Sequence, residues 1–110
     1  MQNYVNAGEN ITLPAPHDVA SGAGALTGAI FAVAQAAALT GEDVVFVRRG
    51  VFDLAKVSAQ AWTVGAKIYW DAAAKLATTT ASGNTLIGAA VVVAANPSET
   101  GRVLLDGVIR

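Results

Sequence analysis

A repeated arrangement of glycines and apolar runs constrains this chain more than any other feature of its sequence. The apolar run 26–34 has an echo in 86–94, and each copy continues through a glycine to a second apolar run and a further glycine. The repeated glycines are Gly28, Gly41 and Gly50 in the first copy and Gly88, Gly101 and Gly107 in the second. Because self-similar segments indicate repeated structural units, we expect two related hairpin units, 26–52 and 86–109. Short Ala- and Val-rich copies also match by composition alone, so both explanations stay open.

Apolar stretches separated by turn residues predict strands along most of the chain. Segment 42–54 carries the strongest strand pattern, and a glycine within a strand marks a bulge or a sharp bend. We therefore expect this strand to kink at Gly50 and to cross to another part of a barrel. Gly28 and the strand-forming residues after it favour a strand over a helix at 29–34.

The other strands follow from the same patterns. Pro14 and Pro16 end an edge strand at 9–13, because proline has no N–H to donate to a neighbouring strand, and 21–24 is expected to be a turn. Strands at 67–71 and 75–80 form a hairpin within the insert 57–84, a strand at 85–95 is the longest of the set, and a last strand covers 101–106. About eight short strands at regular spacing predict an all-β fold of one small domain, a β-barrel or a sandwich. The many Ala and Gly positions favour the barrel, whose walls come close together.

The composition indicates one domain that buries part of its surface against other copies of itself. The chain has 110 residues, of which 54% are hydrophobic and 14% are charged, whereas charged residues make up about a quarter of a typical domain. So little charge covers the surface of a monomer poorly, which favours an oligomer.

Charge and cysteine content exclude several classes of partner and site. The net charge is −1 and only Arg48 and Arg49 are adjacent basic residues, so no basic stripe for nucleic acid is present. The chain has no cysteine, which removes disulfides and thiol chemistry. Segment 19–41 has no charged residue but is rich in Gly and Ala, so we expect no membrane-spanning helix. Residues 1–8 read as an N-terminal arm without the pattern of a secretory signal.

Three blocks in a fixed order carry a resemblance to a known family. They are 26–34, 41–54 with its Gly-Val-Phe sequence, and 65–71 with its Tyr-Trp-Asp sequence, and the match continues through Trp62 and 86–90. In these blocks the chain resembles the small capsid decoration, or cement, proteins of tailed bacteriophages. The resemblance implies a β-tulip-like barrel that forms a homotrimer and binds the major capsid protein on the outside of the virion, after synthesis in the cytoplasm of the bacterial host. It implies no enzyme activity and no cofactor.

The residue types that catalyse reactions or bind metals in other proteins do not occur here in the patterns that such sites need. His17 is the only histidine, and a catalytic histidine needs converging partners, whereas the side chain of Asp18 next to it diverges in an extended segment. No spacing singles out two carboxylates as an acid–base pair or a metal cage. The glycines of 22–28 match a dinucleotide fingerprint only nominally, because Pro14 and Pro16 lie upstream and a strand, not a helix, is expected to follow. We expect no catalytic, cofactor or metal site.

Aromatic and Arg residues are the usual anchors of protein interfaces, and they supply most of the candidates for subunit or capsid contact. The candidates are Tyr4, His17, Arg48, Arg49, Trp62 and Trp70. Trp62 is expected in an exposed or interfacial loop, and Trp70 either in the core or at an interface. Arg48 and Arg49 either end in solvent or form a salt bridge to Asp53 or Glu42 of another copy. The arm, with Tyr4, and the loop 14–18 are expected to face the capsid. The alternative function is a small-ligand or carbohydrate-binding β-barrel module.

Overall fold

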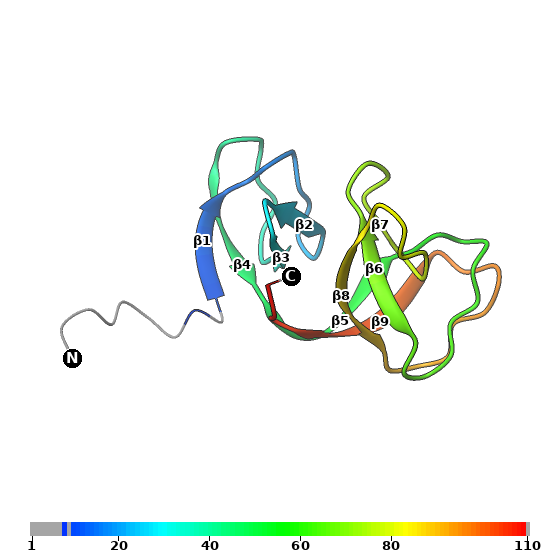
Figure 1. Cartoon of the computed structure of the whole chain (residues 1–110). Coiled ribbons are helices and arrows are strands. Elements are labelled where there is room, and N and C mark those ends of the chain that lie inside the picture. The colour runs from blue at the N-terminus through cyan, green and yellow to red at the C-terminus, as the bar shows by residue number, and fades with distance from the viewer. Residues whose placement is uncertain (1–7, 9, 110) are drawn as a thin grey trace, which may run out of the picture.

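The computed structural model describes residue 8 and residues 10–109, and this part of the chain contains strands and turns but no helix (Figure 1). Nine strands are present among the described residues, in two antiparallel sheets. They are β1 (Asn10–Pro14), β2 (Gly24–Thr27), β3 (Ile30–Ala34), β4 (Asp43–Val47), β5 (Arg49–Ala55), β6 (Lys67–Asp71), β7 (Leu76–Thr78), β8 (Thr85–Ala90) and β9 (Thr100–Asp106). The predicted all-β class of a single domain is confirmed.

The first sheet has the order β1-β4-β3-β2, and β1 lies at its edge as the proline pattern predicted. Ile11 and Leu13 of β1 lie opposite Phe46 and Val44 of β4, so alternate side chains of both strands reach one face. Phe46 is buried there among small side chains, largely alanines. This face forms a core of its own beneath the loops that follow β1 and β3.

The second sheet has the order β5-β9-β8-β6-β7 and curls into a half-barrel, the right-hand part of the molecule in Figure 1. Its two edge strands approach each other where Lys56, just after β5, forms a bridge with Ala77 of β7. The N–H of Val57 donates to the carbonyl of Ala77 at 3.0 Å. The half-barrel encloses the larger core, in which Trp62, Ile68 and Val103 are fully buried.

The chain passes from the first sheet to the second within one residue. β4 ends at Val47 and β5 begins at Arg49, so the predicted crossing is confirmed, but its position at Gly50 is wrong. The change of partner strand comes at Arg48, because Arg49 is already paired with Asp106 of β9. Gly50 lies within the paired strands β5 and β9, opposite Leu105. Its φ of 131° is one that residues with a side chain rarely adopt.

Strand β3 joins the two cores because its side chains alternate between them. Ala32 and Ala34 lie in the core of the first sheet, whereas Val33 lies in the core of the half-barrel and Phe31 packs against it. The ring of Phe31 meets that of Trp70 on β6 with centroids 4.9 Å apart and planes tilted by 52°, an arrangement that aromatic pairs favour. The two sheets are therefore held by a shared hydrophobic contact.

Two strand predictions were wrong. Segment 21–24 was expected to be a turn throughout, but Gly24 already begins β2, which pairs with β3. Segment 85–95 was expected to form the longest strand, but β8 ends at Ala90, and β5 and β9 are longer at seven residues each. Beyond β8 the chain turns away, because Ala94 exchanges both of its backbone hydrogen bonds with Trp62, at 2.9 and 3.1 Å.

The segments predicted as related units contribute one antiparallel pair to each sheet. Unit 26–52 contains the pair β3 and β4, and unit 86–109 contains the pair β8 and β9. Between the units, β6 and β7 pair with each other. The origin of the two units by duplication stays a prediction.

Two glycines allow parts of the half-barrel to approach closely. A Cβ at Gly101 would overlap the ring of Trp62, and a Cβ at Gly88 would overlap the carbonyl oxygen of Leu104 on the next strand. Gly101 thus provides the space in which Trp62 lies flat against β9.

We expect Gly101→Ala to lower the free energy of unfolding by about 1–3 kcal/mol, the usual cost of forcing an extra group into a packed core. Unfolding in urea, followed by tryptophan fluorescence, measures the change. Thr100→Ala, at the exposed neighbouring position of β9, is the matched control and should change stability by less than about 0.5 kcal/mol. Equal stability of the two variants would contradict the role given to Gly101.

Candidate interaction surfaces

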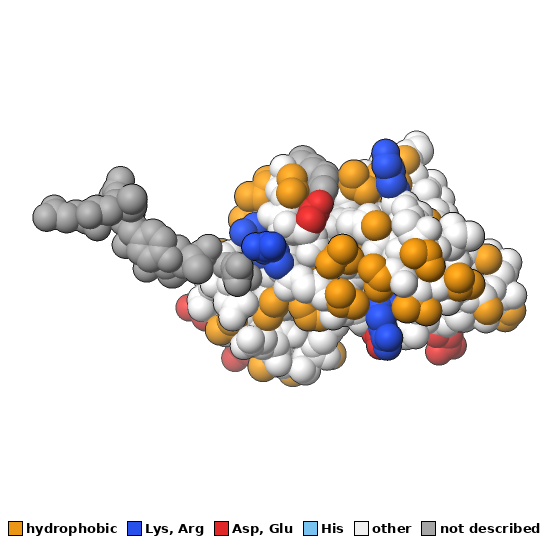
Figure 2. All heavy atoms as spheres, turned by 90° about the horizontal axis from the view of Figure 1, so that it is seen from below, with side chains coloured by type: hydrophobic (Ala, Val, Ile, Leu, Met, Phe, Trp, Pro, Cys, Tyr) orange, Lys and Arg blue, Asp and Glu red, His pale blue; other side chains and the backbone are white. Residues whose placement is uncertain are grey.

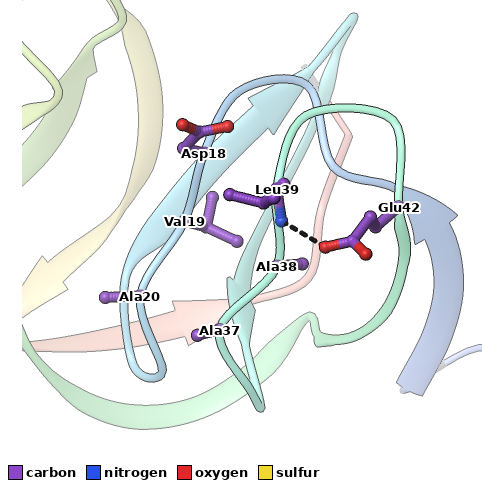
Figure 3. A pocket seen from close by; sticks show the side chains of 7 residues that line it. All are labelled: Asp18, Val19, Ala20, Ala37, Ala38, Leu39 and Glu42. Atoms are coloured by element: carbon purple, nitrogen blue, oxygen red, sulfur yellow. Dashed lines mark hydrogen bonds between the residues drawn. The ribbon is translucent and has the colours of Figure 1, made fainter.

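A hollow of about 400 Å³ lies at the loop end of the first sheet (Figure 3). We call it the loop hollow. Residues of two loops line it, namely Asp18, Val19, Ala20, Ala37, Ala38, Leu39 and Glu42. In Figure 3 the side chains of Val19 and Leu39 lie between the two carboxylates.

Backbone hydrogen bonds between the two loops hold the loop hollow in shape. Val19 and Ala38 exchange N–H to carbonyl bonds of 2.9 and 3.0 Å. The N–H of Gly41 donates to the carbonyl of Ala15 at 2.9 Å, and the N–H of Ala15 donates to the carbonyl of Glu42 at 2.9 Å. The two loops therefore form one tied unit, and a partner binding there meets a formed surface with little ordering cost.

Both carboxylates of the loop hollow accept backbone hydrogen bonds. Asp18 Oδ1 accepts from the N–H of Thr40 at 2.8 Å and from its Oγ1 at 2.9 Å, and Glu42 Oε1 accepts from the N–H of Leu39 at 2.7 Å. The hydrogen bonds from Thr40, first that of its N–H, lower the pKa of Asp18 below its ordinary value of 3.8. Asp18 is therefore ionised at neutral pH.

The loop hollow combines an exposed apolar side chain with fixed negative charge. Leu39 is 63% exposed although its backbone is hydrogen-bonded in place, while Val19 beneath it is buried. Such a surface suits a partner that offers an apolar side chain beside a lysine or arginine.

A second surface is the outer face of β5 and β9, which we call the outer ladder. Its side chains alternate with those that enter the half-barrel core, and Val51 and Leu104 are 52% and 45% exposed there. The outward residues are Arg49, Val51, Asp53 and Ala55 of β5 and Thr100, Arg102, Leu104 and Asp106 of β9. Figure 2 views the molecule from the side on which β9 lies in Figure 1, and hydrophobic side chains gather in the middle of that face with charged side chains around them.

Within the outer ladder, Asp53 and Arg102 form an ion pair between adjacent strands. Arg102 donates from Nε to Asp53 Oδ1 at 2.9 Å and from Nη2 to Oδ2 at 3.3 Å. The hydrogen bond from Arg102 lowers the pKa of Asp53 below 3.8, and Asp53 in turn raises the pKa of Arg102. Asp53 therefore has a cationic partner in its own chain, whereas the sequence suggested Asp53 as a partner for an arginine of another copy.

Another hollow, of about 280 Å³, lies between the two sheets. It brings together His17 and Trp70, two residues that the sequence suggested separately, next to Asp18, Ala55 and Lys75. His17 Nδ1 lies 3.0 Å from the carbonyl oxygen of Asp18, a neighbour in the chain. Trp70 is 3% exposed, so it offers little surface to a ligand there.

The burial of the two tryptophans corrects the sequence interpretation. Trp62 was expected in an exposed or interfacial loop, but it is 1% exposed, because its ring covers Gly101 and its backbone pairs with Ala94. For Trp70 the core alternative holds within one chain, since its ring packs on Phe31. Neither side chain lies on the surface of the folded subunit.

The remaining predicted residues have different environments. Arg48 was expected to end in solvent or at another copy, but it is partly buried and donates from Nε to the carbonyl of Gly8 at 2.5 Å and from Nη1 to that of Gly107 at 2.6 Å. Arg49 is exposed at the start of the outer ladder. Tyr4 lies outside the described residues. No contact of these residues with another chain is shown, and their role at an interface stays a prediction.

Sequence reasoning missed Lys56, which is buried and has no carboxylate partner among the described residues. Its ammonium donates to the carbonyls of Val57, Gln60 and Ser98 at 2.9, 2.5 and 3.2 Å and lies 5.6 Å from the ring centroid of Trp62. Burial lowers the pKa of this ammonium. The group ties together the loops that enclose Trp62. The only feature of Lys56 visible in the sequence is its position at the end of an alternating strand pattern. A lysine at such a position usually indicates an exposed strand end, so its burial could not be predicted.

Within the part of the chain that is described, no group of three or more His, Cys, Asp or Glu side chains is placed to hold a metal ion. The described residues also include no helix with the length and apolar character needed to cross a membrane.

Comparison with known proteins gives one match. A family model described as phage cement protein matches residues 5–105 of the chain. This span contains eight of the nine strands in full and all of β9 except its last residue, Asp106. Among curated proteins and among solved structures, no match to the chain was found.

The causes given for the lowered pKa values of Asp18 and Asp53 can be tested with two variants, each of which should change the pKa of one group and not of the other. Thr40→Val removes the Oγ1 donor, so the pKa of Asp18 should rise toward 3.8 while that of Asp53 stays unchanged, and Arg102→Gln should do the reverse. Because each folded-state pKa is depressed, each group adds stability that is present above pH 3.8 and is lost as the pH falls through the folded-state value. Carboxyl-carbon NMR titration measures both values. A shift of both groups in either variant would contradict the assignment.

Proposed function

The chain belongs to the phage cement protein family, and we propose that it binds the outside of the assembled capsid and stabilises the shell without catalysing a reaction. The observation that carries the proposal is the family match over residues 5–105, which covers residues of all nine strands. We propose further that the protein is made in the cytoplasm of the bacterial host and that its partner on the virion is the major capsid protein.

The loop hollow is the surface that we propose faces the capsid. It lies beside the loop 14–18, and its exposed Leu39 is held in place by the hydrogen bond between its N–H and Glu42. Burial of a leucine side chain on binding contributes about 1.5–3 kcal/mol. The ionised Asp18 beside it favours a basic residue on the shell.

Binding to the assembled shell alone is sufficient for stabilisation. A protein that binds the assembled lattice but not the free capsid subunits shifts the equilibrium toward the lattice by mass action. At a free concentration about 100 times the dissociation constant, this contributes about 2.7 kcal/mol for each occupied site. No chemical step is needed.

The first test is cosedimentation of the purified protein with undecorated heads of its own phage, in expanded and unexpanded form. We expect binding to the expanded heads and a higher temperature of shell disruption once they are decorated. Absence of binding to the expanded heads would refute the proposed function.

Leu39→Asp tests the assigned surface in the same assay, and we expect it to weaken binding to expanded heads by about 10- to 100-fold, the equivalent of the lost leucine burial. Val64→Asp is the matched control, since Val64 is 66% exposed but does not line the loop hollow. Unchanged binding of Leu39→Asp would move the capsid contact elsewhere and leave the function intact.

We also propose that the protein is a homotrimer, which the low proportion of charged residues supports. Light scattering of a dilute solution should then give about 33 kDa, three times the 11.1 kDa of one chain. A mass of one chain at all concentrations would contradict a stable trimer.

A further inference from the structure

The two strands of the outer ladder present the same outward sequence. On β5 the outward residues Arg49, Val51 and Asp53 come before Ala55, and on β9 the outward residues Arg102, Leu104 and Asp106 come after Thr100. Each strand thus carries a positive charge, an apolar side chain and a negative charge in that order. The inward residues between them differ, because they serve the core of the half-barrel.

The antiparallel register turns this repeated sequence into a pattern of alternating charge. Val51 lies opposite Leu104, Arg49 lies opposite Asp106, and Asp53 lies opposite Arg102. The four charged residues therefore occupy the corners of a rectangle in which every neighbouring corner has the opposite sign. Val51 and Leu104 lie at its centre.

A rectangle of alternating charge is complementary to a copy of itself. When a second copy is turned over about either axis in the plane of the ladder, each arginine comes to lie over an aspartate and the two apolar centres meet. This complementarity is greatest when the strands of the two copies are aligned, and two sheets that pack face to face keep their strands within about 30° of alignment. We propose that the outer ladder is a self-association surface that pairs with the outer ladder of a second copy around a twofold axis.

The charge balance of the outer ladder favours a second copy of this chain over a different protein as its partner. Two arginines and two aspartates give the ladder no net charge, so it offers no steering to a uniformly charged surface. The bidentate pair of Arg102 and Asp53 already satisfies both groups in part, which reduces the cost of removing water from them. Val92 and Val93, both exposed, line a hollow of about 330 Å³ together with Asp53 and Arg102 and extend the apolar area beyond the ladder.

This pairing is compatible with the proposed trimer and distinct from it. A cyclic threefold assembly joins two different patches of each subunit, whereas a twofold contact joins one patch to itself. The outer ladder therefore links subunits of different trimers. The pairing is a property of the free protein, so its test does not depend on capsid binding.

The test is sedimentation equilibrium of the full chain over a wide range of concentration. We expect the mean mass of the wild type to rise with concentration beyond that of its dilute form, and Leu104→Asp to abolish this rise, since it places an unpaired charge at the centre of the contact. Val64→Asp, which changes another exposed apolar side chain outside the ladder, should associate like the wild type. Circular dichroism and thermal unfolding verify that each variant is folded.

A charge-swapped variant gives the sharper result. Exchanging the signs at all four corners (Arg49→Asp, Asp53→Arg, Arg102→Asp and Asp106→Arg) preserves self-complementarity but places like charges together against the wild type. The swapped protein should associate with itself and fail to associate with the wild type, with mixed pairs at least 10-fold weaker in native mass spectrometry of the mixture. Mixed pairs as abundant as chance predicts would overturn the proposal. If the swapped protein does not fold, association of Leu104→Asp equal to that of the wild type would overturn it.

Discussion

The passage from one sheet to the other at Arg48 determines how the rest of the structure is arranged. With a single residue between β4 and β5, the first sheet has no slack with which to move away from the half-barrel. Strand β3, next to β4, must therefore serve two cores, and its alternate side chains do so, small alanines on one side and Phe31 and Val33 on the other. Arg48 holds this junction by donating to carbonyls near both ends of the described chain, at Gly8 and Gly107.

The half-barrel depends in turn on one large side chain and the space made for it. Trp62 fills the interior where Gly101 has no Cβ, and Lys56 closes the interior from the loop side through three carbonyls. The Nε1 of Trp62 is buried and has no hydrogen-bond partner among the residues that the structure describes. Packing of the ring stabilises the core, whereas the unbonded N–H costs free energy. A core built in this way tolerates few changes at the glycine, because overpacking cannot be relieved by a flexible neighbour.

Local sequence patterns predicted the strands and the change of sheet. The burial of Trp62 and the end of β8 depend on long-range contacts, which local patterns do not contain. Pro14 and the β-branched residues of β4 act within their own segments, so their strands could be predicted from sequence. Trp62 could not be placed, because the space that buries it is created by Gly101, 39 positions later in the chain. The end of β8 at Ala90 has the same cause, since Ala94 is drawn to Trp62. For the candidate surfaces, Arg49 was identified, but its ladder needs the register of β5 with β9, which local patterns do not give.

The two surfaces on opposite sheets select partners by different arrangements of charge. In the loop hollow both acidic groups, Asp18 and Glu42, accept backbone N–H groups, so the charge has one sign and favours an unlike, basic partner. In the outer ladder the signs alternate, the net charge is zero, and complementarity is greatest with an identical ladder. The proposed capsid contact and the proposed self-association therefore use separate surfaces. Because each pattern disfavours the partner of the other, the two contacts can operate on one small domain without competing for the same partner.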